Sequence, residues 1–98
     1  MAGQKQLDDV YIRDRDMKWL AESDAVVAET SNPSLGVGYE LASAERLGKP
    51  VIILHNSKRS QLSAMIAGTK YFDHVFEYET VTDAIQILNQ EMKSLENK

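Results

Sequence analysis

The sequence contains no cysteine, only two prolines, and few aromatic residues, which make up 7% of its 98 positions. Without cysteine, neither a disulfide nor a thiolate metal site can form, and a reducing cytoplasm is the expected location. No apolar run approaches the roughly 20 residues that a membrane-spanning helix needs. The basic residues are scattered and the net charge is −4, so neither a nucleic-acid polymer nor a membrane is an expected partner. These absences favour one small soluble domain.

Apolar residues make up 43% of the chain, and their spacing predicts alternating strands and helices. Short apolar runs predict three strands, at residues 25–29, 51–55 and 74–78. Helical spacing predicts four helices, at residues 8–23, at 39–47, at 61–68, and from Thr80 or Thr82 onward. Such alternation indicates a three-layer α/β fold of the Rossmann-like or flavodoxin-like type, in which a parallel sheet of about three strands has helices on both faces.

The segment after the first predicted strand, NPSLGVGYEL at residues 32–41, combines a flexible loop with an acid. Within a loop predicted over residues 30–38, Gly36 and Gly38 permit close backbone approach to a ligand, and Ser34 adds a hydroxyl donor. Ligands of parallel sheets bind at the carboxyl ends of strands, so this loop is placed to hold a phosphate. An ordinary strand-to-helix turn is the alternative. The residues alone favour the turn, because the loop matches neither the dinucleotide nor the Walker fingerprint.

Two carboxylates are candidate catalytic groups. Glu40 falls in the predicted first turn of a helix, where the macrodipole favours an acid whatever its function and would also keep a nucleophile ionised. Asp16 shares a predicted helix face with Ile12 and Leu20, and a carboxylate on a partly apolar face costs free energy unless it is paired or used. Plain surface exposure is the alternative for Asp16. For Glu40 the alternative is an acid favoured there by the macrodipole alone, and the residues by themselves favour that alternative. No cluster of ligating residues indicates a metal or another cofactor.

Residues 11–68 resemble the 2′-deoxynucleoside 5′-phosphate N-hydrolases, which are relatives of the nucleoside 2-deoxyribosyltransferases. The resemblance rests on four motifs in order: RDMKWL, SDAVVAE, PSLGVGYEL and LSAMI. It implies hydrolysis of the N-glycosidic bond of 2′-deoxynucleoside 5′-monophosphates to a free base and 2-deoxyribose 5-phosphate, with no cofactor. Transfer of the sugar to a second base is one alternative, and an inactive nucleotide-binding or self-associating remnant is another. The serine of LSAMI suits a phosphorylated substrate and therefore favours the hydrolase.

The resemblance also implies a role for each matching acid. Glu40 would attack the anomeric carbon of deoxyribose and form a covalent glycosyl intermediate. Asp16 would assist at the nucleophile and in proton transfer. Two carboxylates can divide these duties, as they do in retaining glycosidases, because the oxocarbenium-like transition state is stabilised by a nearby anion.

Five further positions are candidates for substrate binding. Ser34 and Gly36 match positions that hold the 5′-phosphate in the family, and Gly38 lies in the same glycine-containing segment. Ser63 matches a serine that reaches the phosphate in the neighbouring subunit of a homodimer, and Met65 would lie near that shared site. A phosphate anchored in this way would orient the sugar toward the nucleophile.

The sequence departs from the family at its start. The family opens with a strand that ends in a Gly-Ser-Ile-Arg-Gly-Gly-like loop, followed by a helix and a second strand, and none of these precedes the RDMKWL motif here. Residues 1–98 are therefore expected to form one partial domain, truncated at the N-terminus, in which the strand at 25–29 has an uncovered edge. Three arrangements fit this departure: a truncated product, a missing strand supplied by another chain, or dimerisation across the open edge.

Overall fold

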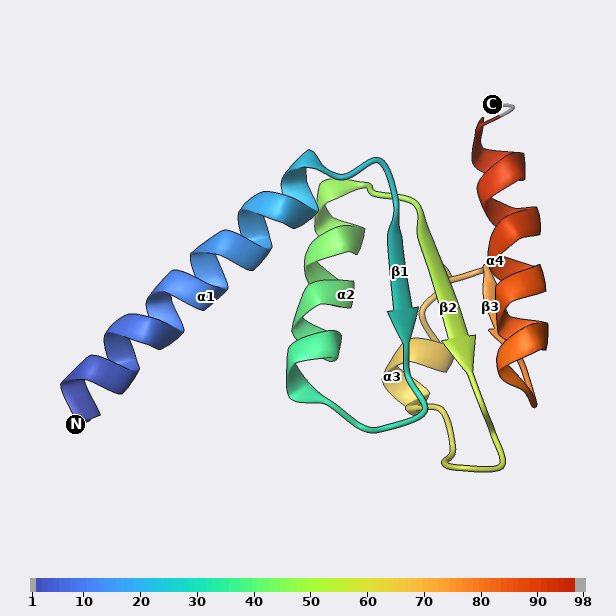
Figure 1. Cartoon of the computed structure of the whole chain (residues 1–98), viewed down its shortest axis with the longest axis horizontal. Coiled ribbons are helices and arrows are strands. Elements are labelled where there is room, and N and C mark those ends of the chain that lie inside the picture. The colour runs from blue at the N-terminus through green and yellow to red at the C-terminus, as the bar shows by residue number, and fades with distance from the viewer. Residues whose placement is uncertain (1, 97–98) are drawn as a thin grey trace.

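The computed structural model describes residues 2–96, with side chains from Asp8 onward. Its elements, in chain order, are α1 (Ala2–Glu22), β1 (Val26–Glu29), α2 (Leu35–Leu47), β2 (Val51–His55), α3 (Ala64–Ala67), β3 (Val75–Glu77) and α4 (Val81–Glu96). The three strands form one parallel sheet in the order β1-β2-β3, with α2 and α4 on opposite sides of the strands (Figure 1). The α/β fold with helices on both faces of a narrow parallel sheet is confirmed.

The central strand is β2, and all five of its residues are buried. On the β1 side of β2, the backbone amide of Val26 donates to the carbonyl of Pro50, just before β2, at 2.8 Å, and that of Thr30 donates to the carbonyl of Leu54 at 3.0 Å. Because successive backbone groups of a strand alternate in direction, those of Val27 and Glu29 point the other way. Within residues 2–96 no strand pairs with that side, so β1 is an edge strand, as expected.

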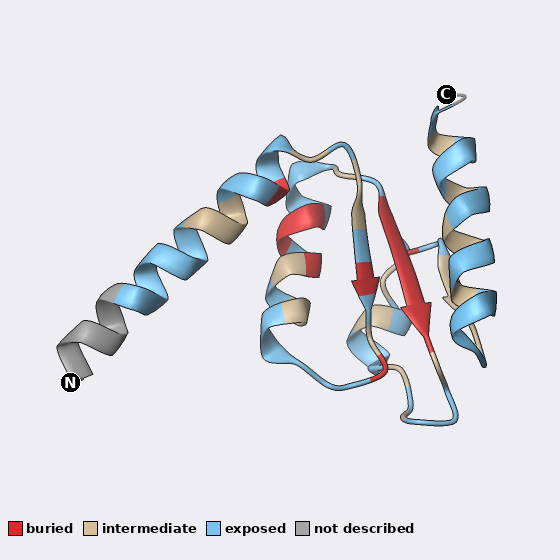
Figure 2. Ribbon diagram, viewed as in Figure 1, coloured by how far each residue is buried: buried red, intermediate tan, exposed pale blue. Residues whose placement is uncertain are grey.

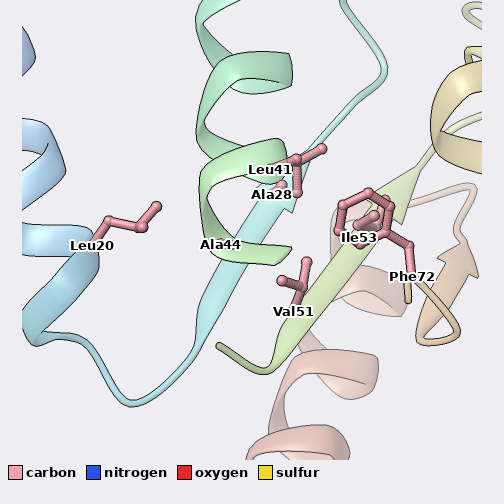
Figure 3. Close-up of a cluster of buried hydrophobic side chains, with 7 residues drawn as sticks. All are labelled: Leu20, Ala28, Leu41, Ala44, Val51, Ile53 and Phe72. Carbon is pink, nitrogen blue, oxygen red and sulfur yellow. The ribbon is translucent and has the colours of Figure 1, made fainter. Parts of the chain in front are cut away.

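The hydrophobic core fills the space between the sheet and the helices α1 and α2 (Figure 3). Its buried members are Leu20, Ala28, Leu41, Ala44, Val51, Ile53 and Phe72. Leu41 and Ile53 have at most 1% of their surface exposed, and complete burial of such a side chain stabilises the fold by about 2 kcal/mol. Burial is concentrated in β2 and in the side of α2 that faces it, whereas α4 and the part of α1 from Asp8 onward are largely exposed (Figure 2).

Helix α1 begins at Ala2, six residues before the predicted start, and ends at Glu22 instead of Ser23. The spacing of apolar residues did not predict this extension, because the added turns need no apolar stripe. Figure 1 shows α1 running away from the sheet. Among the described side chains of α1, Leu20, near its end, is the buried core residue. The added sequence is rich in good helix formers such as alanine, glutamine and lysine. Although α1 has 21 residues, neither it nor another helix within residues 2–96 has an apolar stretch that could cross a bilayer.

The apolar stripe predicted for the last helix is only partly covered. Three of its side chains are half-buried, namely those of Ala84, Leu88 and Leu95. The other three are exposed, namely those of Val81, Ile85 and Met92. A sheet of three short strands is too narrow to cover the whole stripe. The helix start is instead fixed locally, since Asp83 N donates to Thr80 Oγ1 at 3.1 Å and Thr80 N to Asp83 Oδ2 at 3.3 Å. Thr80, and not Thr82, is the cap.

Candidate functional site

Helix α2 begins four residues earlier than predicted, so the expectation that Gly36 and Gly38 lie in a loop is wrong. Ser34 is the N-cap: its backbone is extended and its Oγ accepts a hydrogen bond from Val37 N at 3.3 Å. The first helical bond runs from Gly38 N to the Ser34 carbonyl at 3.2 Å. The amides of Leu35 and Gly36 therefore have no acceptor within the helix. The sequence did not predict this start, because its first turns contain two glycines, which are poor helix formers.

A cavity of about 700 Å³ lies between the start of α2 and the segment around α3. Ser34 and Gly38 line it from one side, and Ser63 and Met65 from the other. Apolar side chains complete much of its wall: Val37, Leu41, Ile66 and Phe72. Its volume is within the usual range for a small-molecule site. Four of the five predicted substrate-binding residues thus face one cavity, whereas Gly36 does not line it.

Two large apolar side chains stand in solvent among the residues that line this cavity. Leu35, at the first position of α2, has 96% of its surface exposed, and Met65 in α3 has 82%. Ser63 caps the short helix α3, because its Oγ accepts a hydrogen bond from Met65 N at 3.3 Å. Apolar surface of this kind around a cavity is typical of a site that a ligand or another protein surface covers.

Glu40 does not line the cavity. It lies two residues after Gly38 and two before Ala42, both of which do. At about 100° per residue, a separation of two places Glu40 on the opposite side of α2. Glu40 therefore lies on a different side of α2 from the cavity-lining Ser34 and Gly38, whereas Gly36, four residues before Glu40, lies on the side of Glu40.

Helix α1 contacts α2 beside Glu40. Arg13 Nη2 donates to the hydroxyl of Tyr39 at 3.0 Å, and this hydrogen bond raises the pKa of Arg13 and lowers the pKa of Tyr39. Asp16 follows Arg13 by three residues and precedes the buried Leu20 by four, so all three share one face of α1. The fold therefore brings Asp16 onto the face of α1 that meets α2, on the side away from the cavity. Asp16 accepts a hydrogen bond from Arg15 Nη2 at 3.2 Å.

A polar network that the sequence did not indicate lies at the carboxyl end of β1. Glu29 accepts hydrogen bonds from Ser31 N at 2.6 Å, from Ser31 Oγ at 2.7 Å and from the hydroxyl of Tyr78. Desolvation raises the pKa of Glu29, but the hydrogen bonds from Tyr78 and Ser31 together outweigh it and hold that pKa below its usual range. The ionised carboxylate thereby fixes the start of the chain segment that leads to Ser34. No three histidine, aspartate or glutamate side chains gather as metal ligands among the residues that the structure describes.

The chain matches the model of a known family. The family model described as nucleoside 2-deoxyribosyltransferase matches residues 2–94, nearly the whole chain. The chain belongs to the nucleoside 2-deoxyribosyltransferase family. The resemblance that its four motifs indicated is confirmed.

Relatives within the nucleoside 2-deoxyribosyltransferase family carry hydrolase names. The 5-hydroxymethyl-dUMP N-hydrolase of Mus musculus is 52% identical over 61 residues, which cover 61% of this chain and 35% of the mouse protein. The putative 2′-deoxynucleoside 5′-phosphate N-hydrolase 1 of Nematostella vectensis is 46% identical over 83 residues, covering 80% of this chain and 56% of that protein. A protein of the same name from Methanococcoides burtonii is 45% identical over 67 residues, which cover 68% of this chain and 54% of that protein. The chain thus spans between about a third and somewhat over half the length of these relatives.

Proposed function

We propose that this protein hydrolyses the N-glycosidic bond of 2′-deoxynucleoside 5′-monophosphates, releasing a free base and 2-deoxyribose 5-phosphate. The observation that carries the proposal is the cavity at the amino end of a 13-residue helix, which Ser34 lines from the start of that helix. The Ser34 hydroxyl and the helix-end amides of Leu35 and Gly36 suit a phosphate dianion, and Ser63 of a second copy would add another hydroxyl. The names of the relatives supply the reaction class.

In the proposed mechanism the phosphate binds at the end of α2 and the sugar extends along the side that faces α1. Glu40 lies five residues after Leu35, about 7.5 Å along the helix axis, which is the scale of a nucleotide's sugar-phosphate unit. The Glu40 carboxylate attacks the anomeric carbon and displaces the base, which takes a proton from Asp16. A water molecule then hydrolyses the glycosyl ester, gives its proton to Asp16, and releases the sugar phosphate.

A homodimer is part of the proposal, with Ser63 of one copy completing the site of the other. The exposed side chains of Leu35 and Met65 support it, because a second copy that covered them would remove apolar surface from water. A cytoplasmic location is also part of the proposal and rests on the lack of cysteine.

The test is base release from deoxynucleoside 5′-monophosphates, followed by chromatography. The substrates are the four common ones and 5-hydroxymethyl-dUMP, which the name of the mouse relative specifies. We expect Glu40→Gln to lower kcat on the order of a thousandfold or more, because the amide cannot form the ester. Glu22→Gln, at an exposed position of α1, is the matched control and should leave the rate unchanged.

Three outcomes would change the proposal. Base release that persists in Glu40→Gln would exclude this nucleophile. An exchanged nucleotide formed when a second free base is added would assign a transferase instead. Chemical-shift changes on adding a deoxynucleotide, without release of base by the wild type, would leave only binding.

A further inference from the structure

His55 is buried at the carboxyl end of β2, with 1% of its surface exposed, and the proposed reaction does not use it. Its Nε2 lies 2.8 Å from the carbonyl oxygen of Ser60, and its Nδ1 lies 2.8 Å from Thr30 Oγ1. A carbonyl oxygen only accepts hydrogen bonds, so Nε2 carries the proton and donates to Ser60. In the neutral ring Nδ1 then accepts from the Thr30 hydroxyl. One imidazole ring therefore joins two separate loops.

These two loops lead into opposite walls of the cavity. Thr30 starts the segment that carries Ser34, and both residues line the cavity. Ser60 directly precedes Gln61, which lines the other wall together with Ser63. His55 itself does not line the cavity, so any effect that it has on the cavity passes through the two loops.

A second hydrogen bond joins the same loops without the ring. Ser60 Oγ donates to the carbonyl oxygen of the buried Ser31 at 2.6 Å. Ser31 is held in turn by β2, because Asn56 N donates to Ser31 Oγ at 2.9 Å. The His55 ring and the Ser60 hydroxyl together form what we call the wall bracket.

We propose that His55 is a positioning residue which, through the wall bracket, sets the distance between Ser34 and Ser63 across the cavity. A buried histidine needs a partner for each ring nitrogen, but partners in a single loop would satisfy it equally well. Here the two partners come from opposite walls, so the ring transmits the position of one wall to the other. In the proposed homodimer, Ser34 binds the phosphate of its own copy from one wall and Ser63 binds that of the neighbouring copy from the other. The separation of the walls therefore determines whether both hydroxyls reach hydrogen-bonding distance of their phosphates. The inference rests on the proposed function for the identity of that ligand.

The test uses two mild substitutions and amide hydrogen exchange on the full chain. Thr30→Val keeps the side-chain shape but removes the hydroxyl bonded to His55, and Ser60→Ala removes the direct bond to Ser31. We expect Thr30→Val to speed exchange about two- to tenfold at residues 61–66, in the wall that was not changed, because one hydrogen bond of the bracket is lost. Ser60→Ala should speed amide exchange by a similar factor at residues 31–34, in the opposite wall. His74→Gln is the control: this histidine is exposed, bonds Glu91 and should leave both walls unchanged.

Steady-state kinetics on the same variants give a second readout. Loosened walls should raise KM several-fold for a deoxynucleoside monophosphate while kcat changes little, whereas partial unfolding would lower kcat. Faster exchange confined to the mutated wall in both variants would overturn the inference. Because exchange requires no turnover, an inactive wild type would refute the proposed function and leave this test intact.

Discussion

The carboxylate of Glu29 accepts hydrogen bonds from Ser31, two residues ahead, and from Tyr78, beyond β3. The bonds from Ser31 are local, whereas the bond from Tyr78 exists only because the parallel sheet brings the carboxyl ends of β1 and β3 to the same end of the sheet. Since the folded-state pKa of Glu29 is depressed, its ionised form stabilises the fold above the ordinary glutamate pKa of about 4.3. That contribution is lost as the pH falls through the lower folded-state pKa.

Replacing Tyr78 with phenylalanine tests this assignment. We expect Tyr78→Phe to lower the free energy of unfolding by up to about 1 kcal/mol near pH 6, because Glu29 is partly exposed and its hydrogen bonds are screened by water. The difference from the wild type should shrink as the pH falls through the lowered folded-state pKa of Glu29, because the carboxylate then becomes protonated. Urea unfolding at pH 6 and below measures it. Tyr71→Phe is the control, since the Tyr71 hydroxyl donates to the Lys49 carbonyl at 2.6 Å and its loss should cost the same at each pH. A Tyr78→Phe effect independent of pH would contradict the assignment.

At the scale of elements, α2 has glycines in two different settings. Gly38 lies inside the helix, and a Cβ added there would meet nothing within 4 Å. Gly48 ends the helix with φ of 71°, a left-handed conformation that costs other residues free energy, and its amide donates to the Ala44 and Glu45 carbonyls. One residue type therefore weakens the start of this helix and stabilises its end.

Alanine substitution should separate these two settings. Gly38→Ala is expected to raise the free energy of unfolding by roughly 0.5–1 kcal/mol, because alanine loses less backbone entropy in a helix. Gly48→Ala is expected to lower it by about 1 kcal/mol, because alanine is strained at positive φ. Urea unfolding at pH 7 measures both. Shifts of the same sign would show that α2 does not begin and end where the structure places it.

At the scale of the whole molecule, the chain is extended for its length. Its radius of gyration is 14.9 Å, against about 13 Å for a compact domain of this size. The cause is visible in Figure 1, where α1 runs away from the sheet. An edge strand, the exposed cavity rim and the uncovered part of α4 leave much surface for a second copy.

Mixing two inactive variants tests whether Ser63 acts across a dimer. If it does, exchanging subunits between Glu40→Ala and Ser63→Ala gives mixed dimers with one intact site, and roughly a quarter of the wild-type rate should return. Glu40→Ala mixed with Asp16→Asn is the control and should restore nothing, because both changes fall in the site of one chain. Mixed dimers no more active than the parent variants would place Ser63 in the site of its own chain.

The sequence by itself determined the elements and the family. The strands at 26–29 and 51–55 follow from β-branched apolar runs, and the motifs around Asp16 and Glu40 suffice for the family. The start of α2 could not be predicted, because Gly36 and Gly38 have low helix propensity and the helix nevertheless begins at Leu35, directly after the serine cap. The cap is worth about 1 kcal/mol, and no periodic pattern reports it.

Only the tertiary structure decided which candidate residues meet. It brought Ser34 and Ser63 to one cavity, turned Glu40 to the other side of α2, and joined the cavity walls through His55. Spacing along a chain fixes the face of a helix on which a side chain lies, but the element that packs against that face depends on contacts between distant segments. The hydrogen bonds of the buried His55 ring and the orientation of Glu40 are consequences of that packing.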